Sequence, residues 1–268
     1  MPAPDLTPLD LAPPPYPLRV FLHADHARPE DLAGSVALVI DNLRASVTIT
    51  AALAHGARAV IPTLTVDEAL ARRERHLREH PTDPPLLGGE RGGILIPGFD
   101  LDNSPRAYTR DRVDGRTIIF TTANGTAALL RAKGASLVLI ASLVNLSAVA
   151  QAVADDPRPV RIIACGTRDA VGLDDALPAG ALAERLTALG RTPDHDDAAR
   201  LARLAWDAGR PSLLDQMRDS RGGRGLARLG LTDDLAFCSA IDSLPVVPRF
   251  DPASGAITLL PAPPGTTP

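Results

Sequence analysis

Short apolar runs alternate with amphipathic stretches along most of the chain, and this alternation constrains the fold more than any other feature. VALVID at residues 36–41 precedes the helical pattern SVTITAALAHG, ARAVIP at 57–62 precedes TVDEALARRERHLREH, and RTIIFTT precedes NGTAALLRAKG. SLVLIAS and PVRIIACGT continue the rhythm. Strands that alternate with helices form a largely parallel sheet with helices on both faces. The sequence therefore predicts a three-layer α/β/α fold.

A weak internal repeat lies within this pattern. IDNLRASVTITAALAHGARAVI and FTTANGTAALLRAKGASLVLI both read as a buried strand, a polar turn, an Ala-rich helix and a second buried strand. Gly56 and Gly134 stand where the C-cap of a helix favours a positive φ. The repeat favours two related βαβ-containing halves, with a division into subdomains near residue 110. Convergence on a common βαβ pattern explains it equally well.

Proline-rich segments mark both ends of the chain. PAPDLTPLDLAPPPYPL at the start and PAPPGTTP at the finish cannot donate regular backbone hydrogen bonds. We therefore predict tails at residues 1–17 and 261–268 and a folded domain at 18–260.

Composition excludes several classes of partner. A net charge of -4 and an aromatic content of 3% supply neither a basic field nor stacking platforms for nucleic acid. No apolar run reaches the roughly 18 residues that a membrane span requires, and the first thirty residues lack a signal-peptide pattern. Two cysteines do not make a disulfide framework. We expect a soluble cytoplasmic protein with neither nucleic-acid nor membrane partners.

Polar residues gather directly after three of the predicted strands. In parallel α/β sheets, ligands bind outside the carboxyl ends of the strands, where loops lead into helix N-termini. Hydroxyls and free N–H groups there suit an anion. The predicted binding residues in these loops are Ser46, Thr121, Thr122, Asn124, Gly125, Thr126, Gly166 and Thr167.

Each of these residues also has a purely structural explanation. Ser46, Asn124 and Thr126 could serve only as helix N-caps, and Asp41 could cap the turn after its strand. Asp174 and Asp175 could only favour the dipole of the next helix. TTANGT offers more hydroxyls than one cap uses, which favours a binding role for the loop as a whole.

The stretch LLGGERGG at residues 86–93 places four glycines around Glu90 and Arg91. Glycines permit positive φ angles and close backbone approach. Glu90 would then face a cation and Arg91 an oxyanion. Together with Asp41, Arg44, Arg168 and the Asp174-Asp175 pair, this pattern indicates a site for an anionic substrate bridged by a divalent metal.

Signatures of common phosphate and nucleotide enzymes are absent. Leu43 stands where a haloacid dehalogenase needs a second Asp, and Val171 where a cysteine phosphatase needs its Arg. There is no GxxxxGK[ST] loop and no GxGxxG after a strand, and the six histidines lack metal-ligand spacing.

Five segments, taken in order, resemble the 2-phosphosulfolactate phosphatase family. They are VALVIDNLRAS, LLGGERGGILIPGFDLDNSPRAYT, IIFTTANGTAAL, GTRDAVGLDDALPAGAL and LGLTDDLAFCSAIDSLPVVPRF, which together extend over about residues 19–259. GERGG followed by GFDLxNSP and TTxNGT is an unusual combination, so the resemblance is specific.

The resemblance implies a Mg²⁺-dependent phosphatase that converts 2-phospho-3-sulfolactate to 3-sulfolactate, a step toward coenzyme M. We hypothesise catalytic roles for Asp41, Arg44, Glu90, Arg91 and Asp175, in which Asp41, Glu90 and Asp175 hold or orient Mg²⁺. Asn103 and Ser104 of the GFDLDNSP segment would join the substrate-binding residues. The resemblance and the chain length are compatible with a homodimer.

Several positions depart from the family pattern. Asn42 replaces an aliphatic residue, Val47 interrupts a run of hydroxyls, Ala123 replaces a threonine and Pro178 replaces a cysteine. These changes argue against a catalytic cysteine and are compatible with a changed substrate. The alternatives are therefore a phosphatase for another phosphorylated small acid, or a non-catalytic anion-binding protein. The later segment DSRGGRGLARLG reads either as a loop over the site or, preferably, as a solvated approach to a helix.

Overall fold

A computed structural model describes residues 16–193 and 197–261. The predicted tails at 1–17 and 261–268 lie outside these residues, apart from Tyr16, Pro17 and Pro261. The strands form one sheet in the order β5-β4-β6-β3-β11-β10-β7-β2-β8-β1-β9. Their bounds are β1 (Pro17–Phe21), β2 (Val36–Ile40), β3 (Ala59–Pro62), β4 (Leu86–Arg91), β5 (Ile94–Leu95), β6 (Thr117–Thr121), β7 (Leu137–Ala141), β8 (Val160–Ala164), β9 (Thr192–Pro193), β10 (Pro248–Asp251) and β11 (Ala256–Leu259).

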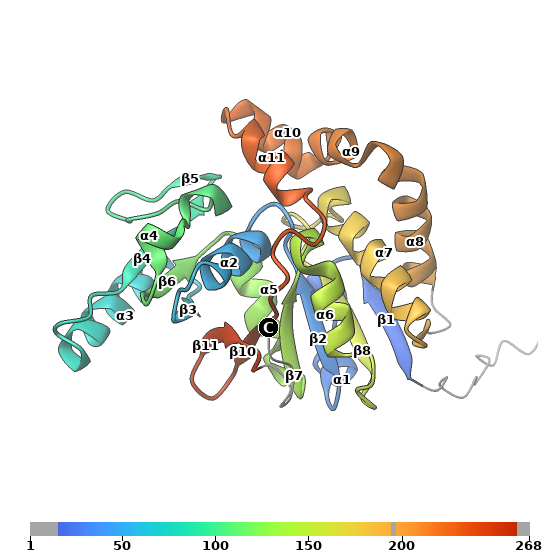
Figure 1. Ribbon diagram of the computed structural model, residues 1–268, viewed down its shortest axis with the longest axis horizontal. Helices are drawn as coiled ribbons and strands as arrows, with labels where there is room; N and C mark the ends of the chain where they lie inside the picture. The colour runs from blue at the N-terminus through green and yellow to red at the C-terminus, as the bar shows by residue number, and fades with distance from the viewer. Residues whose placement is uncertain (1–15, 194–196, 262–268) are drawn as a thin grey trace, which may run out of the picture.

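Helices cover both faces of this sheet (Figure 1), which confirms the predicted three-layer α/β/α fold. α6 and α7 pack on one face of β7-β2-β8-β1, with α8 against α7, while α2 and α5 pack on the other face. α3 covers the outer face of β4-β6-β3. The helix bounds are α1 (Pro29–Leu32), α2 (Ala45–Ala54), α3 (Val66–Glu79), α4 (Arg110–Val113), α5 (Gly125–Arg131), α6 (Leu146–Ala152), α7 (Leu173–Ala188), α8 (Asp197–Gly209), α9 (Leu213–Asp219), α10 (Arg221–Arg228) and α11 (Thr232–Cys238).

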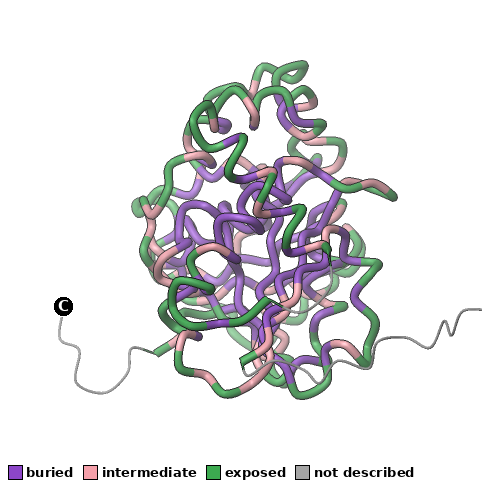
Figure 2. Tube along the Cα trace, turned by 90° about the vertical axis from the view of Figure 1, so that its right-hand side faces the viewer, coloured by how far each residue is buried: buried purple, intermediate pink, exposed green. Residues whose placement is uncertain are grey.

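Strand β2 shows why the apolar runs of the sequence are continuous. All five of its residues are buried. Val36, Leu38 and Ile40 face the layer of α6 and α7, whereas Ala37 and Val39 face α2 and α5. Side chains alternate across a strand, so a strand that is covered on both faces must be apolar throughout. Figure 2 shows the resulting concentration of buried chain in the middle of the molecule.

The sheet consists of two parallel parts joined by a hairpin. β4-β6-β3 are parallel to one another, as are β7-β2-β8-β1-β9. The antiparallel hairpin β10-β11 lies between them and pairs with β7 on one side and β3 on the other. The two repeated segments, β2-α2-β3 and β6-α5-β7, cross between the parts in opposite directions. The repeat therefore links the two parts twice.

The hairpin also reverses the strand direction between the two parts, because three successive pairings are antiparallel. A twist of about 20–25° per strand, accumulated over the five steps from β2 to β6, amounts to roughly a right angle. The carboxyl ends of β2 and β6 nevertheless meet, since a Cβ atom on Gly125 would lie 2.6 Å from the Asp41 carboxylate. The predicted subdomain division near residue 110 stays a prediction.

The two glycines of the repeat differ. Gly56 follows α2 with a φ of +98°, as predicted for a helix C-cap. The prediction for Gly134 is wrong, because its φ is not positive and it ends a short 3₁₀ turn. α5 continues into that turn and so ends without a left-handed residue.

Within residues 16–193 and 197–261, no helix combines the length and the apolarity needed to cross a bilayer. The expected cytoplasmic location and homodimer stay predictions.

We predict that Gly180→Ala destabilises the fold. An alanine Cβ at this position would lie 2.1 Å from the Ala202 carbonyl oxygen, where α7 packs on α8. Alanine within a helix normally gains up to about 1 kcal/mol over glycine, but overpacking costs about 1–3 kcal/mol. Urea denaturation should therefore show a net loss. Gly134→Ala is the matched control, because a Cβ there meets nothing within 4 Å, and its unfolding free energy should stay within about 0.5 kcal/mol.

Candidate active site

A cavity of about 650 Å³ opens where the loops after β2, β4, β6 and β8 converge beneath α10. It is the natural place for a ligand, because it lies at the carboxyl ends of strands from both parts of the sheet. Seven of the predicted site residues line it: Asp41, Arg44, Glu90, Asn103, Thr122, Asn124 and Thr167.

The other predicted residues lie around this cavity without lining it. They are Ser46, Arg91, Ser104, Thr121, Gly125, Thr126, Gly166 and Asp175. Most of them hold the lining residues in place, as described below. Their predicted roles in binding and catalysis stay predictions.

Asp41 closes strand β2 and faces the cavity at the start of α2. Its Oδ1 accepts a hydrogen bond from the Ala45 N–H at 3.1 Å, and its own N–H donates to Ser46 Oγ at 2.8 Å. The second oxygen, Oδ2, has no hydrogen-bond partner among the described residues and lies where a Gly125 side chain would be. Ser46 thus orients the loop, Gly125 makes room for the carboxylate, and Asp41 keeps one oxygen free for a ligand.

Glu90 holds two loops together with its carboxylate. Oε1 accepts from the Ala123 N–H at 2.8 Å, and Oε2 accepts from the Gly93 N–H at 2.7 Å. One side chain therefore fixes both the loop after β6 and the turn after β4. Each oxygen already has one protein donor, although a carboxylate oxygen can accept a second.

The four glycine positions around Glu90 require glycine for different reasons. Gly92 and Gly93, with φ of +65° and +86°, form the two-residue turn of the β4-β5 hairpin. Gly89 has a φ of +134°, and a Cβ there would lie 1.9 Å from the Thr121 carbonyl oxygen. A Cβ on Gly88 would lie 2.4 Å from the Tyr108 hydroxyl. The close approach expected at Gly88 and Gly89 is therefore to other parts of the protein, while Gly92 and Gly93 line the cavity.

Arg91 points away from the cavity, as its alternation with Glu90 along β4 requires. Its guanidinium donates to the Glu90 and Leu64 carbonyl oxygens and to Thr121 Oγ1, at 2.7, 3.0 and 2.9 Å. This arrangement joins β4, β6 and the loop after β3. It gives no support to the predicted contact between Arg91 and an oxyanion.

Asp175 is a second carboxylate that joins two loops. It lies in the first turn of α7, where its Oδ1 accepts from the Asn42 N–H and its Oδ2 from the Gly166 N–H, both at 2.8 Å. The loops after β2 and β8 are thereby fixed to each other. The explanation that Asp175 only favours the helix dipole is therefore incomplete, because its carboxylate also accepts hydrogen bonds from two loops.

Asp41 in the cavity wall and the buried Asp174 and Asp175 beside it all have raised pKa values. Burial raises the pKa of Asp41 from 3.8 to about 7, and the charges of Asp174 and Glu90 add to this shift. Burial, followed by the charges of Asp174 and Asp41, raises the pKa of Asp175. Asp174 is raised chiefly by burial, and its Oδ1 has no hydrogen-bond partner. Such concentrated negative charge favours the binding of a proton or a cation.

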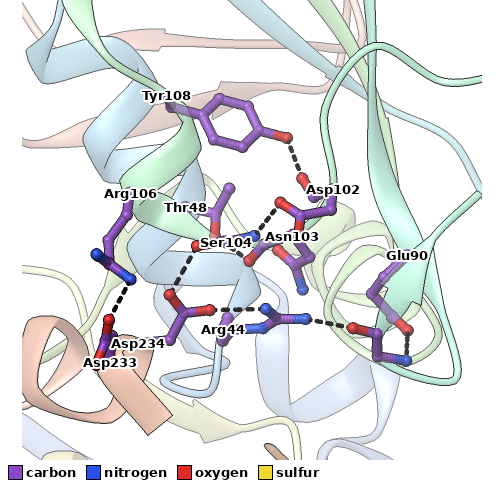
Figure 3. Close-up of polar contacts among 11 residues, drawn as sticks. Arg44, Thr48, Glu90, Asp102, Asn103, Ser104, Arg106, Tyr108, Asp233 and Asp234 are labelled. Atoms are coloured by element: carbon purple, nitrogen blue, oxygen red, sulfur yellow. Dashed lines mark hydrogen bonds and ion pairs between the residues drawn. The ribbon is translucent and has the colours of Figure 1, made fainter. Parts of the chain in front are cut away.

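Arg44 lines the cavity and forms a buried ion pair with Asp234 (Figure 3). Its guanidinium donates to Asp234 Oδ2 at 2.7 Å and to the Gly93 carbonyl oxygen at 2.9 Å. The other oxygen of Asp234 accepts from Ser104 Oγ at 2.6 Å. Arg44 and Asp234 are each only 1–2% exposed. The predicted Ser104 therefore acts on the site through Asp234, which orients Arg44.

The hydroxyls of TTANGT are largely used within the protein. Thr122 Oγ1 accepts from the Thr126 N–H at 3.3 Å, Thr126 Oγ1 donates to the Thr122 carbonyl at 3.0 Å, and Thr121 accepts from Arg91. Thr126 is the second residue of α5 and not its N-cap, so the N-cap explanation is wrong for this residue, although its hydroxyl is used within the protein. Thr122 and Asn124 still line the cavity, and Asn124 makes no side-chain capping bond.

His23, which the sequence gave no reason to select, holds the loop after β8. Its Nδ1 accepts from the Asp25 N–H at 3.2 Å, so the proton lies on Nε2, which donates to the Arg168 carbonyl oxygen at 2.7 Å. Arg168 has a φ of +58°, unusual for a residue with a Cβ. The histidine thus supports a backbone conformation that places Arg168 in the cavity wall.

Sequence reasoning missed two contributions from the C-terminal third of the chain. Asp234 stands in an acidic pair that reads as an ordinary helix start. DSRGGRGLARLG was interpreted as a solvated approach, but it forms α10, whose Arg221, Gly225 and Arg228 line the cavity. The preferred interpretation of this segment is therefore wrong. Three glycines among three arginines in a helix were the available signal.

Whether the site could hold a divalent metal depends on which carboxylate oxygens have no hydrogen-bond partner. Among the described residues, no three His, Cys, Asp or Glu side chains are grouped so that they could hold a metal ion. Of the predicted set, both oxygens of Glu90 and Asp175 bind backbone N–H groups, whereas Asp41 keeps Oδ2 free. Mg²⁺ commonly takes one or two carboxylates and completes its shell with water and substrate phosphate. The residues fit an ion that arrives with the substrate rather than a complete protein cage.

Comparison with known proteins agrees with this geometry. The 2-phosphosulpholactate phosphatase family matches residues 22–252. The chain belongs to this family. Membership makes the protein a phosphoric monoester hydrolase, as the resemblance implied.

Relatives match over most of their length. A probable 2-phosphosulfolactate phosphatase of Symbiobacterium thermophilum is 44% identical over 231 residues, which cover 86% of this chain and 97% of the relative. A protein of the same description from Deinococcus radiodurans is 42% identical over 250 residues, which cover 91% and 98%. One from Caldanaerobacter subterraneus is 39% identical over 220 residues, which cover 82% and 89%.

The departures from the family pattern have local explanations. Ala123 contributes its backbone N–H to Glu90, which needs no threonine hydroxyl. The Asn42 amide donates to the Cys238 carbonyl oxygen and accepts from the Leu143 N–H, so it ties α11 to the loop after β7. Cys165 is buried, and burial raises its thiol pKa well above 9. It does not line the cavity described above. The expectation that no cysteine is catalytic stays a prediction.

We predict that the Arg44 and Asp234 charges depend on each other. Asp234→Asn leaves a buried guanidinium without its counter-ion and should lower the unfolding free energy by about 3 kcal/mol, whereas Arg44→Met with Asp234→Leu should cost less than either single change. Urea denaturation of Arg44→Met, Asp234→Leu and the double variant measures this coupling. Asp233→Asn is the control, because Asp233 is 72% exposed and pairs only with the exposed Arg106. Additive losses in the double variant would contradict the coupling.

We also predict that Asp41→Asn stabilises the protein at alkaline pH. The pKa of Asp41 is about 7 in the folded chain and 3.8 as a free side chain, so its contribution to stability is full below about pH 4 and is lost as the pH rises through 7. Asparagine removes the charge and keeps an acceptor for the Ala45 N–H. In EDTA at pH 8, the unfolding free energy of the variant should exceed that of the unmodified chain by at most about 4 kcal/mol, as measured by urea denaturation. The advantage should vanish at pH 4. An equal advantage at both pH values would contradict the raised pKa of Asp41.

Proposed function

We propose that the protein hydrolyses the phosphate ester of 2-phospho-3-sulfolactate to 3-sulfolactate and phosphate, with Mg²⁺ as cofactor. The observation that carries this proposal is the free Oδ2 of Asp41 in a cavity that also presents arginine side chains. The names of the relatives support the substrate. The substrate carries a phosphate, a carboxylate and a sulfonate on three carbons, so its recognition is mainly the neutralisation of negative charge.

Asp41 would hold Mg²⁺ through Oδ2, with water and phosphate oxygens as the remaining ligands. The bound ion would neutralise phosphate charge and lower the pKa of a coordinated water. The raised pKa of Asp41 supports this role, because a carboxylate that is costly to ionise alone gains most from a neighbouring cation. Glu90 and Asp175 would act indirectly, by fixing the loops that carry the binding groups.

The phosphate would lie where α5 begins, beside Thr122 and Asn124. Backbone N–H groups in the first turn of a helix carry partial positive charge and suit phosphate oxygens. Glu90 fixes this turn through the Ala123 N–H, and Gly125 brings it against Asp41. The arrangement would place phosphate within reach of both Asp41 and the Arg44 side chain.

Phosphoryl transfer requires positioning and charge stabilisation more than covalent chemistry. An in-line attack by water on phosphorus therefore suits the site, with Arg44 stabilising charge on the phosphate oxygens. Asp234 and the Gly93 carbonyl oxygen would together keep the Arg44 guanidinium oriented where it lines the cavity. Asp41 phosphorylation would be the covalent alternative, which a burst of phosphorylated protein in rapid-quench kinetics would reveal.

We predict that the full chain releases phosphate from 2-phospho-3-sulfolactate with Mg²⁺ and not with EDTA. Asp41→Asn should lower kcat by about a thousandfold or more, because it removes the only free carboxylate oxygen proposed for the metal. Asp233→Asn, an exposed neighbour of the same network, should retain full activity.

The same assay separates the two alternatives. Turnover of another phosphorylated 2-hydroxy acid, without turnover of the sulfonated compound, would replace the substrate and keep the reaction. No turnover of any compound, while anions still raise the melting temperature, would favour an anion-binding protein. Near-normal activity of Asp41→Asn would remove Asp41 from the mechanism.

A further inference from the structure

Three arginines of the cavity wall have no acidic partner. Arg221 and Arg228 come from α10, and Arg168 from the loop after β8. None of them forms an ion pair within the described parts of the chain, whereas Arg44 of the same cavity is paired with Asp234. In a protein with a net charge of -4, three unpaired guanidinium groups around one cavity are a strong local field for anions.

Helix geometry explains which side of α10 faces the cavity. Arg221, Gly222, Gly225, Leu226, Arg228 and Leu229 line it. Their spacing of one, four, five, seven and eight residues from Arg221 defines one face of an α-helix. Arg224 lies outside this face, and its guanidinium bonds to the Asp219 carbonyl oxygen at the helix start. The helix therefore presents two of its three arginines to the cavity.

Glycines on this face set the distance of the helix from its surroundings. A Cβ on Gly222 would lie 2.4 Å from Asp174 Oδ2, so the backbone of α10 packs directly against the first turn of α7. A Cβ on Gly225 would meet nothing within 4 Å, so that position opens onto free space. Glycine costs roughly 1 kcal/mol per residue within a helix. Gly225, at least, has no packing contact that would account for this cost, and leaves room between Arg221 and Arg228.

The position of α10 separates it from the proposed phosphate site. Asp41 and the start of α5 form the base of the cavity at the carboxyl ends of β2 and β6. α10 lies beyond these strand ends, above the sheet in Figure 1, and contributes other lining residues of the same cavity. Arg221 reaches across to the Thr167 carbonyl oxygen at 3.4 Å, next to Arg168. A three-carbon substrate with its phosphate at the base would direct its other acid groups to this wall.

We propose that α10 is the helix that recognises the sulfonate of the substrate, with Arg221 and Arg228 as its binding residues. This inference rests on the proposed function and adds the source of its specificity. A sulfonate has three equivalent oxygens and a fixed single charge, and a guanidinium offers paired donors to two of them. Two arginines two helical turns apart, with Gly225 between them, form an open, positively charged surface for such a group.

The test is a comparison of two substrates that differ only in the sulfonate. kcat/KM is measured with Mg²⁺ for 2-phospho-3-sulfolactate and for 2-phospholactate, using the full chain and the variants Arg221→Gln, Arg228→Gln and Arg224→Gln. The ratio of the two values should fall about tenfold or more in Arg221→Gln and in Arg228→Gln, because each loses a charge-assisted hydrogen bond to sulfonate. It should stay unchanged in Arg224→Gln, whose side chain lies outside the cavity.

A conservative variant separates recognition from folding. Arg221→Lys keeps the charge and loses the paired donors, so its ratio should lie between those of the unmodified chain and Arg221→Gln. Melting temperatures of all variants check that the exposed substitutions leave the fold intact.

The outcomes distinguish the inference from the function on which it rests. If the unmodified chain hydrolyses the sulfonated substrate but Arg221→Gln and Arg228→Gln lose activity equally on both substrates, or lose none, the role of α10 is wrong and the phosphatase remains. If the unmodified chain hydrolyses neither substrate, the proposed function itself fails and the inference falls with it.

Discussion

The site depends on buried carboxylates that accept hydrogen bonds from the backbone N–H groups of other loops. Asp175 joins the loops after β2 and β8, and Glu90 joins the loop after β6 to the turn after β4. These four segments come from distant parts of the sequence and from both parallel parts of the sheet. A carboxylate with two N–H donors is a strong, directional link, so two side chains fix the four loops as two pairs. The bond from Arg44 to the Gly93 carbonyl oxygen joins one pair to the other.

The same solution creates an electrostatic cost. Asp41, Asp174 and Asp175 are each at least nine-tenths buried, and burial raises the pKa of all three. Neighbouring negative charges add to the shift for Asp41 and Asp175. Backbone donors stabilise the charge on Asp175, whereas Asp41 has one such donor and a free oxygen. Structural and functional acids are therefore distinguished by their hydrogen bonds rather than by their burial. Destabilisation of this kind is common where a site must bind a cation.

Periodicity and strand-end position predicted most of the fold and roughly half of the site. Continuous apolar strands such as β2 require helices on both faces, and polar loops after parallel strands must lie at one edge. What these rules omit is long-range pairing. Nothing local to Arg91 shows that it turns to the Leu64 carbonyl, and nothing local to Asp234 shows that it meets Arg44, 190 residues earlier. The close approach of Gly89 to Thr121 likewise reads from sequence as freedom for a ligand.

The origin of each wall bears on how substrate choice could change in such a fold. The base of the cavity is built from strand ends and fixed by Asp175 and Glu90, so a substitution there disturbs several loops at once. α10 lies outside the sheet, and its Arg221 and Arg228 are exposed and have no ion-pair partner among residues 16–193 and 197–261. Changes on that helix would alter the charge offered to the distal end of a substrate while the loops around Asp41 stay in place. Under the proposed function, the selection of the remaining acid group would therefore change through Arg221 and Arg228 while the loops proposed to hold the phosphate stay in place.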